Sequence, residues 1–377
     1  MGNIMVVAGE TSGDMHAARV VREIKKINPD VNFFGMGSAF LREAGVDILI
    51  DPQEISTIGF GEALKNINIH LKNLQTLKRA ITVRKPDVIF LVDNPGFNML
   101  MARIAYKKKV PVVNYFSPSA WIWGRWRARW MARYNATIAS VFPMEARVYR
   151  EAGADLVFVG HPLIDIVKVH GEHREICQDL ELDPEKKIIG LLPGSRKQEI
   201  DSLLPEMLKT AERIQKETAD YQFIIPLAKG IDKEKVSRMA ANYELILKLV
   251  EGKAYEVMSI SDLIITASGT ATLEAAIIGT PMVIIYKVSP FTYRLGKKVL
   301  GIEYIGMPNI IANREIAPEL IQEKANSDYI YKTAMSLLNK PHLLNNTRVE
   351  LRYVKEKLGS SGALKRTAEL LLKKGGL

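Results

Sequence analysis

Three short segments rich in Gly, Ser and Thr are placed to bind an anionic ligand. They are residues 8–14 (AGETSGD), 191–196 (LLPGSR) and 267–274 (ASGTATLE), and each lies between an apolar run and a helix-like stretch. At such a corner glycine lets the backbone approach a ligand, and the N–H groups that open the helix attract anions. The first segment has neither the GxGxxG spacing of dinucleotide-binding oxidoreductases nor the spacing of P-loop enzymes. A glycine turn that only closes a strand–helix unit is the structural alternative.

The second and third segments carry side chains suited to a nucleoside diphosphate. Ser195 offers a hydroxyl, and the planar guanidinium of Arg196 matches phosphate geometry. Glu274, about one turn into a helix, can accept hydrogen bonds from ribose hydroxyls. As alternatives, Arg196 is a surface residue after a turn and Glu274 only complements its helix dipole. The residues predicted to hold the nucleotide are Gly9, Ser12, Gly13, Gly194, Ser195, Arg196, Ser268, Gly269, Thr270 and Glu274.

Asp93 is a candidate general base. It follows the apolar run that ends at Val92, within the segment VDNPGFN at 92–98, so its carboxylate is predicted at the carboxyl edge of a sheet. A transfer to a sugar hydroxyl needs one base near that hydroxyl, and a partly desolvated carboxylate can serve. His16 is the rival base, and a simple Asp-Asn-Pro-Gly turn is the structural alternative.

The residue spacing predicts neither a metal site nor a cofactor. Among His161, His170, His173 and Cys177 only the two middle histidines have a suggestive interval, and these lie in a polar stretch. Cys177 is the only cysteine, so no intramolecular disulfide can form and a reducing compartment is favoured.

A basic and aromatic segment is typical of a surface that meets phosphate groups. The net charge is +10, and no acidic residue lies between Asp93 and Glu145. Tryptophans and arginines suit a membrane interface or a phosphorylated lipid, and also single-stranded nucleic acid. A helix with tryptophans toward the core and arginines toward water is the structural alternative. The residues are Trp121, Trp123, Arg125, Trp126, Arg127, Arg129, Trp130 and Arg133.

A second apolar face follows residues 58–62 (IGFGE). Leu64, Ile67, Leu71 and Leu74 share one side of a predicted helix. This face packs on a sheet or lies on a membrane, and packing is the preferred interpretation.

Alternation of apolar runs with amphipathic stretches predicts parallel sheets covered by helices on both faces. One series of strands is expected before residue 168 and a second after it, with the polar stretch 165–187 as the linker. A last helix is predicted from Ser360 or Ser361, as its cap, to Lys374, with an apolar stripe that needs a partner. The predicted strands span residues 3–8, 31–36, 87–92, 111–116, 136–141, 156–159, 187–192, 221–226, 262–266 and 281–286.

Length and composition agree with a two-domain protein. The chain has 377 residues, of which 47% are hydrophobic and 25% charged, as in ordinary globular proteins. The N-terminus lacks the pattern of a signal peptide, and the weakly charged stretch 263–286 is broken by Glu274, Gly279 and Pro281. We therefore expect a cytoplasmic protein without a membrane span.

Taken together, the motifs resemble those of the lipid-A-disaccharide synthases, inverting glycosyltransferases of the GT-B architecture. That fold consists of two Rossmann-like, doubly wound α/β domains that face a central cleft. The matching pieces occur in family order over most of the chain. They are AGETSGD at 8–14, VDNPGFN at 92–98, SPSAWIW at 117–123, GHP at 160–162, LLPGSR at 191–196, ASGTATLE at 267–274 and PNIIANRE at 308–315.

The resemblance implies a reaction between two lipid-linked sugars. A 2,3-diacylglucosamine unit would move from its UDP donor to 2,3-diacylglucosamine 1-phosphate, giving a β-1,6-linked disaccharide 1-phosphate and UDP. In this family Asp93 resembles an essential acidic residue, Arg196 a donor phosphate ligand, Glu274 the ribose contact and Asn309 an essential polar residue of the cleft. The enzyme would work at the inner face of the inner membrane, without a metal.

The resemblance also implies an organisation of the chain. Residues 1–168 would form the acceptor and membrane domain, joined by the C-terminal helix within 345–377, and residues 169–344 the UDP-sugar domain. In the family this last helix is sometimes exchanged between the subunits of a homodimer. This chain departs from the family in having four tryptophans in the basic segment, which affects only how acceptor and membrane are held.

Three rival functions stay open at this level. A UDP-N-acetylglucosamine 2-epimerase shares the architecture but needs no lipid acceptor. A polyprenyl-linked N-acetylglucosaminyltransferase differs in the lipid that it glycosylates. A nucleic-acid-binding protein would explain the positive charge but leaves the segments 191–196 and 267–274 without a role.

Overall fold

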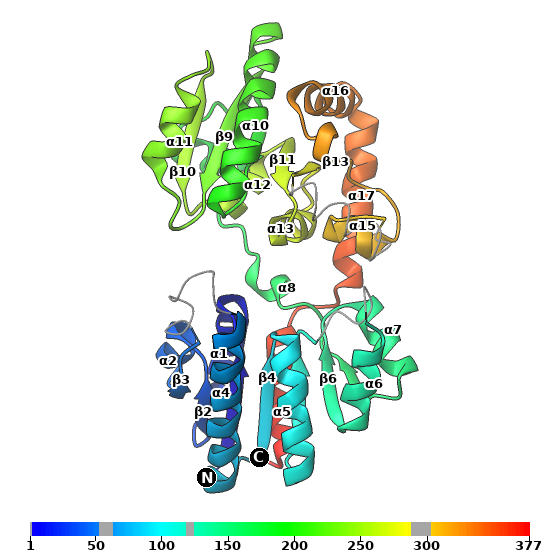
Figure 1. The fold of residues 1–377 in the computed structure, drawn as a ribbon. Coiled ribbons are helices and arrows are strands. Elements are labelled where there is room, and N and C mark those ends of the chain that lie inside the picture. The colour runs from blue at the N-terminus through cyan, green and yellow to red at the C-terminus, as the bar shows by residue number, and fades with distance from the viewer. Residues whose placement is uncertain (1, 53–62, 118–123, 288–302) are drawn as a thin grey trace. The chain divides into compact units, whose positions relative to one another are not determined.

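The computed structural model describes residues 2–52, 63–117, 124–287 and 303–377. The chain divides into two compact units, which are drawn in Figure 1. Unit 1 consists of Met1–Asp165 and Leu358–Leu377, and unit 2 of Ile166–Lys357. Unit 2 is therefore an insertion between the body of unit 1 and the last helix of unit 1. The sequence placed these junctions after residues 168 and 344.

Unit 1 is built on a parallel sheet of seven strands in the order β3-β2-β1-β4-β5-β6-β7. Its central strands β1 and β4 are almost entirely apolar and buried, which suits a sheet covered on both faces. The strands are β1 (Asn3–Ala8), β2 (Asn32–Met36), β3 (Asp47–Ile50), β4 (Val88–Val92), β5 (Val112–Tyr115), β6 (Ala136–Ser140) and β7 (Leu156–Phe158).

Helices cover both faces of this sheet. One core lies between the sheet and helices α1, α2 and α18, and a second core lies between the sheet and α4, α5, α6 and α7. The bounds are α1 (Thr11–Ile27), α2 (Ala39–Glu43), α4 (Ala63–Arg84), α5 (Pro95–Lys108), α6 (Trp126–Arg133), α7 (Pro143–Glu151), α8 (Leu163–Ile166) and α18 (Ala363–Gly375).

Unit 2 repeats this plan with six parallel strands in the order β10-β9-β8-β11-β12-β13. The strands are β8 (Lys187–Leu192), β9 (Tyr221–Leu227), β10 (Leu247–Glu251), β11 (Leu263–Ala267), β12 (Met282–Tyr286) and β13 (Glu319–Ile321). The helices are α9 (His173–Asp179), α10 (Lys197–Glu217), α11 (Lys233–Ala240), α12 (Ala254–Ile260), α13 (Thr270–Ile278), α15 (Met307–Ala312), a 3₁₀ turn (Gln322–Lys324), α16 (Ser327–Leu338) and α17 (Pro341–Lys357).

The predicted α/β class is confirmed, with two parallel sheets of the Rossmann type. Three strands were missed because each is short or lies at a sheet edge: β3, β10 and β13. The expected linker 165–187 contains a helix, α9, whose Ile176 and Cys177 are buried in a small core beside the sheet.

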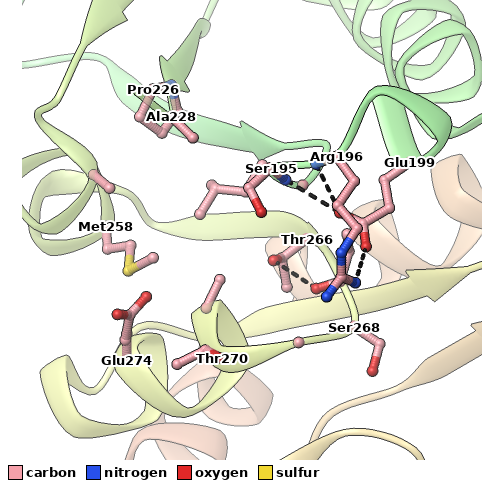
Figure 2. Close-up of a pocket in the computed structure, with 16 residues that line it drawn as sticks. Ser195, Arg196, Glu199, Pro226, Ala228, Met258, Thr266, Ser268, Thr270 and Glu274 are labelled. Carbon is pink, nitrogen blue, oxygen red and sulfur yellow. Dashed lines mark hydrogen bonds and ion pairs between the residues drawn. The ribbon is translucent and has the colours of Figure 1, made fainter. Parts of the chain in front are cut away.

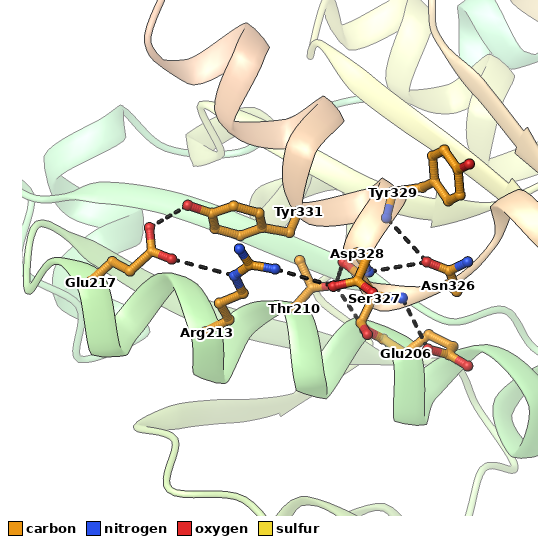
Figure 3. A network of polar contacts seen from close by, with 9 residues as sticks. All are labelled: Glu206, Thr210, Arg213, Glu217, Asn326, Ser327, Asp328, Tyr329 and Tyr331. Atoms are coloured by element: carbon orange, nitrogen blue, oxygen red, sulfur yellow. Dashed lines mark hydrogen bonds and ion pairs between the residues drawn. The ribbon is translucent and has the colours of Figure 1, made fainter.

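A polar network holds α10 and α16 together in unit 2 (Figure 3). The guanidinium of Arg213 lies 3.8 Å from the ring centroid of Tyr331 and pairs with Asp328 at 3.2 Å. Near the other end of the contact, Glu206 accepts a 3.0 Å hydrogen bond from the backbone N–H of Ser327. These contacts supplement the apolar packing of α10, whose N-terminus borders the candidate site described below.

The last helix, α18, packs on unit 1. Its residues Ala368, Leu370, Leu371 and Leu372 are buried in the same core as α1, so the predicted apolar stripe has a partner. The predicted serine cap is wrong, because α18 begins after Gly362, whose φ of +95° suits glycine.

The start of α18 is capped by Asp165, from a distant part of the chain. Its carboxylate accepts hydrogen bonds from the backbone N–H of Gly362 at 2.6 Å and of Leu364 at 3.1 Å. It also accepts one from the hydroxyl of Ser361 at 2.9 Å. The Asp165 carboxylate therefore caps α18 in place of the predicted serine.

Replacing Asp165 with Ala should lower the free energy of unfolding by about 1–2 kcal/mol, as loss of a helix cap does. The measurement is the urea midpoint followed by circular dichroism. Asp30→Ala, at an exposed turn of unit 1, is the matched control and should change stability by less than about 0.5 kcal/mol. Equal midpoints for the two variants would contradict the capping role.

Candidate functional site

A cavity lies at the point in unit 2 where the strand order reverses. Strands β8 and β11 are neighbours, and the chain leaves them in opposite directions along the sheet. Ligands of doubly wound sheets bind at such points, beyond the carboxyl ends of the strands. The cavity measures about 300 Å³, within the range of small-molecule sites. Figure 2 shows its wall, which includes Gly194, Ser195, Arg196, Glu199, Pro226, Ala228, Ala254, Met258, Ser268, Gly269, Thr270, Ala271 and Glu274.

The turn at 193–196 binds a carboxylate of its own chain. Glu199 accepts hydrogen bonds from the backbone N–H groups of Ser195 at 3.1 Å and Arg196 at 3.3 Å. It also pairs with the Arg196 guanidinium at 3.0 Å (Figure 2). Gly194 has a φ of +107°, and a Cβ there would lie 2.3 Å from Glu199 Oε2, so this turn requires glycine. The turn is therefore shaped to hold negatively charged oxygens.

The facing turn opens α13. Gly269 is the N-cap of this helix and has no side chain with which to cap it, and the first two helical residues, Thr270 and Ala271, line the cavity. Ser268 donates its hydroxyl to the Ile305 carbonyl at 3.1 Å, which fixes the approach to the helix. A helix start of this kind attracts phosphate.

Glu274 lies on the cavity wall beside apolar residues. Its Oε1 accepts a 3.0 Å hydrogen bond from the Tyr255 hydroxyl, which orients the carboxylate. Pro226, Ala228 and Met258 also line the cavity (Figure 2). The sequence did not single out this apolar wall, because its residues come from two separate segments, at the end of β9 and on α12. A carboxylate at an apolar wall suits a ribose and its flat base.

Unit 1 has an equivalent reversal point, between β1 and β4. There the segments 8–14 and 92–98 meet, because Ser12 donates its hydroxyl to Asp93 Oδ2 at 3.2 Å. A Cβ on Gly9 would lie 2.0 Å from the side-chain nitrogen of Asn94, and one on Gly13 would lie 3.1 Å from Asp93 Cβ. The glycines of the first segment thus make room for the second.

Asp93 is half-buried at the carboxyl edge of β4, as predicted. Asp93 and Asn94 have φ values of +54° and +50°, the left-handed region that Asp and Asn tolerate best among non-glycine residues. The Asn94 backbone N–H donates to Asp93 Oδ1 at 2.9 Å. Nearby, burial and then the charge of Asp93 raise the pKa of Glu10.

His16 lies in an aromatic setting. Its ring centroid is 4.7 Å from that of Phe116, and burial, followed by the charge of Arg19, lowers its pKa to about 4. Burial, followed by the charge of His16, lowers the pKa of His161 to about 3. Both imidazoles are thus neutral at pH 7, and the low pKa makes His16 a weak proton acceptor.

Asn309 is buried, and all its amide groups contact the protein. Its nitrogen donates to the Ala317 carbonyl at 2.7 Å and to Glu319 at 2.8 Å. Its oxygen accepts from the backbone N–H groups of Ile316 at 2.8 Å and Ala317 at 2.9 Å. Glu319 in turn accepts a hydrogen bond from the backbone N–H of Ile305, and the carbonyl of Ile305 accepts one from the Ser268 hydroxyl. Asn309 does not line the cavity. Through Glu319 it stabilises the loop at Ile305, which contacts the cavity residue Ser268.

Helix α6 turns its two tryptophans outward. Trp126 is 51% exposed and Trp130 38%, so the alternative that packs these two tryptophans in the core is wrong. Arg125 and Arg129 are exposed, and the Arg127 guanidinium lies 5.5 Å from the Trp126 ring centroid. Trp121 and Trp123 lie outside the described residues.

The second apolar face is divided in the structure. Leu71, on α4, is 52% exposed, whereas Leu74 is partly buried against the sheet. The side chains of Leu64 and Ile67, and residues 58–62, lie outside the described part. In the ranges that the structure describes, no three His, Cys, Asp or Glu side chains gather as metal ligands. None of the helices within those ranges is both long and apolar enough to span a bilayer.

Two kinds of comparison with known proteins agree with this geometry. The lipid-A-disaccharide synthase of Geobacter sulfurreducens is 42% identical over 369 residues, which cover 98% of this chain and 96% of that protein. The UDP-GlcNAc 2-epimerase of Neisseria meningitidis, solved bound to UDP-GlcNAc, matches with a TM-score of 0.65 and 14% identity over 98% of this chain and 100% of that one. CalG4, the calicheamicin glycosyltransferase, matches with a TM-score of 0.63 and 12% identity over 100% and 98%. The two structural matches show a shared fold alone.

The family is decided by sequence over nearly the whole chain. A sequence model described as lipid-A-disaccharide synthetase matches residues 4–372, a span that contains both reversal points and the segments 8–14, 92–98, 191–196 and 267–274. The epimerase alternative rests on fold likeness only. This chain belongs to the lipid-A-disaccharide synthetase family, and its activity is the glycosyl transfer that forms the lipid A disaccharide.

Proposed function

We propose that unit 2 holds the UDP of UDP-2,3-diacylglucosamine and that Asp93 of unit 1 activates the acceptor, 2,3-diacylglucosamine 1-phosphate. The proposal rests on one observation: the turn at 194–196, the start of α13 and Glu274 all line the same cavity in unit 2. The diphosphate would lie between the turn at 194–196 and the start of α13, and the ribose at Glu274. The flat uracil suits the apolar wall at Pro226 and Met258. The segment 8–14 would contribute to the donor from unit 1.

The negative charge that develops on the UDP leaving group is met by fixed groups. Arg196 supplies a guanidinium that is 78% exposed in its side chain, and α13 supplies the partial positive charge of its N-terminus. A diphosphate would take the N–H groups that Glu199 now occupies. Such pre-oriented donors stabilise a leaving group without a metal ion, and we include metal independence in the proposal.

With one base and no nucleophile of the protein, the transfer is a single direct displacement, which inverts the sugar carbon. Asp93 would remove the proton from the acceptor 6-hydroxyl as UDP departs, so the new bond forms on the face opposite to the leaving group. His16 is the less suitable base because its ring is held against Phe116, with ring centroids 4.7 Å apart. Asn309 would act by bracing, through Glu319, the loop whose Ile305 carbonyl accepts the Ser268 hydroxyl, and would not contact the reacting atoms.

We place the membrane contact at helix α6. Trp126, Trp130 and Tyr134 form successive edge-on ring contacts with centroids 5.9 and 6.0 Å apart, and Tyr106 extends the row at 5.9 Å from Tyr134. Exposed arginines flank this row at positions 103, 125, 129 and 133. Indole rings at headgroup depth and guanidinium groups on phosphate would hold the enzyme on the inner face of the inner membrane, where both lipid substrates reside.

Replacing Asp93 with Asn should lower kcat about 100-fold or more, because the variant has lost its proton acceptor. UDP affinity, measured by calorimetry, should stay within about twofold since the main contacts proposed for the diphosphate, the ribose and the base lie in unit 2. The assay follows disaccharide 1-phosphate by mass spectrometry from the two diacylglucosamine substrates. Asp87→Asn, at the opposite end of β4, is the control and should keep its kcat. Retained activity in the Asp93 variant, with loss in His16→Gln, would transfer the base role to His16.

Arg196→Ala and Glu274→Gln should each weaken UDP binding by about 10- to 100-fold, the cost of one charged hydrogen-bonding group. Calorimetric titration of each variant with UDP provides the measurement. Arg174→Ala is the control, because Arg174 pairs with Glu185 on the surface of unit 2, away from the cavity wall. If Arg196→Ala and Glu274→Gln bound UDP as tightly as the control, the cavity would not be the UDP site.

Replacing both Trp126 and Trp130 with Ala should reduce co-sedimentation with phosphatidylglycerol-containing vesicles by about tenfold or more, since both rings lose apolar burial. Activity on detergent-dispersed substrates should be retained. Tyr329→Ala, an exposed aromatic of unit 2, is the control. Undiminished sedimentation of the double variant would place the membrane contact elsewhere.

A further inference from the structure

The backbone that carries Asp93 is held at both of its peptide groups. Its N–H donates to the Tyr115 carbonyl at 3.2 Å, which extends the pairing of β4 with β5 by one residue. Its carbonyl accepts a hydrogen bond from the side-chain nitrogen of Asn98. With both peptide groups held, only the carboxylate of Asp93 is left to move, and Ser12 and the Asn94 N–H contact its two oxygens.

These hydrogen bonds act on residues with unusual backbone angles. Asp93 and Asn94 are successive left-handed residues, and Asn94 is the N-cap of α5 although N-caps ordinarily have extended backbone. Left-handed backbone is unfavourable for residues with a side chain and persists only where the surroundings enforce it. Asn98 supplies part of that enforcement from the first turn of α5, where its own N–H also bonds the Asn94 carbonyl at 3.0 Å.

The burial and the contacts of the Asn98 side chain fit a role in holding the Asp93 backbone. Its side chain is fully buried on α5, and no described residue donates to its Oδ1. Burial of an amide for stability alone would normally satisfy both of its ends. Within the described part of the chain, the amide donates to the Asp93 carbonyl, the peptide group of the catalytic-base candidate.

We propose that Asn98 is a positioning residue for the transfer reaction: it fixes the left-handed backbone at Asp93 and so aims the carboxylate at the acceptor hydroxyl. The inference rests on the base role proposed for Asp93. Without the side-chain donor, the Asp93 peptide relaxes toward ordinary backbone and the carboxylate leaves its line of approach. Misplacement of a reacting group by about 1 Å costs on the order of 100-fold in rate.

The test compares Asn98→Leu, a replacement of similar size without a donor, with the wild-type enzyme. We expect kcat to fall about 10- to 100-fold while the KM for the UDP donor stays within about twofold, because the nucleotide contacts are unchanged. The melting temperature should change little, because the replacement also removes the amide oxygen that has no donor among the described residues. Met101→Ala, a fully buried change on the same helix, is the matched control and should lower the melting temperature but keep its kcat.

A double variant separates positioning from general support of the fold. On the Asp93→Asn background, Asn98→Leu should cause no further loss of the residual rate, since residues that act as one unit are not additive. Wild-type kcat in Asn98→Leu beside an inactive Asp93→Asn would overturn the inference and leave the base role of Asp93 standing. An equal further loss on both backgrounds would also overturn it. Full activity of Asp93→Asn would instead remove the proposed base, and this inference with it.

Discussion

Both candidate sites depend on one constraint of parallel sheets. Where the strand order reverses, two neighbouring strands send their helices to opposite faces, and the carboxyl edge between them stays open. In unit 1 the strands are β1 and β4, and in unit 2 they are β8 and β11. The loops that follow these four strands, together with the first turns of the helices after them, contain every nucleotide-binding and base candidate predicted from the sequence with three exceptions. These are Asn309, on α15, and His16 and Glu274, which lie further along α1 and α13.

The two edges are equipped for different chemistry. In unit 2 the loops present N–H groups, a guanidinium and a helix start, and the chain itself shows their preference by binding the Glu199 carboxylate there. In unit 1 the corresponding edge presents a carboxylate, Asp93, whose direction is set by left-handed backbone and by contacts from Ser12 and Asn98. In the proposed reaction, the positive charge that meets the leaving group and the negative charge that accepts the proton would both come from the same architectural element, used twice.

Much of this could be predicted from residue types alone, because Gly, Ser and Thr after an apolar run indicate a strand-to-helix corner, and such corners lie at the open edge of a parallel sheet. Strands with continuous apolar runs, such as β4 and β8, were evident, whereas the short edge strand β13 was not. The two outward tryptophans of α6 share a face by their spacing, but spacing cannot say which face meets the sheet. The role of Asn98 was beyond reach because it depends on φ angles four and five residues earlier.

The insertion of unit 2 into unit 1 has a consequence for biosynthesis. The buried side of α1, which includes Val20, Val21 and Ile24, shares its core with α18, which follows unit 2 in the chain. Unit 2 is complete in the nascent chain at Lys357, before Leu358–Leu377 of unit 1 have been made. Domains usually fold in the order of their synthesis. Here the unit that starts first is completed after the other, so its apolar surface is covered only once α18 has been made, and a chain that stops within unit 2 would expose that surface to aggregation.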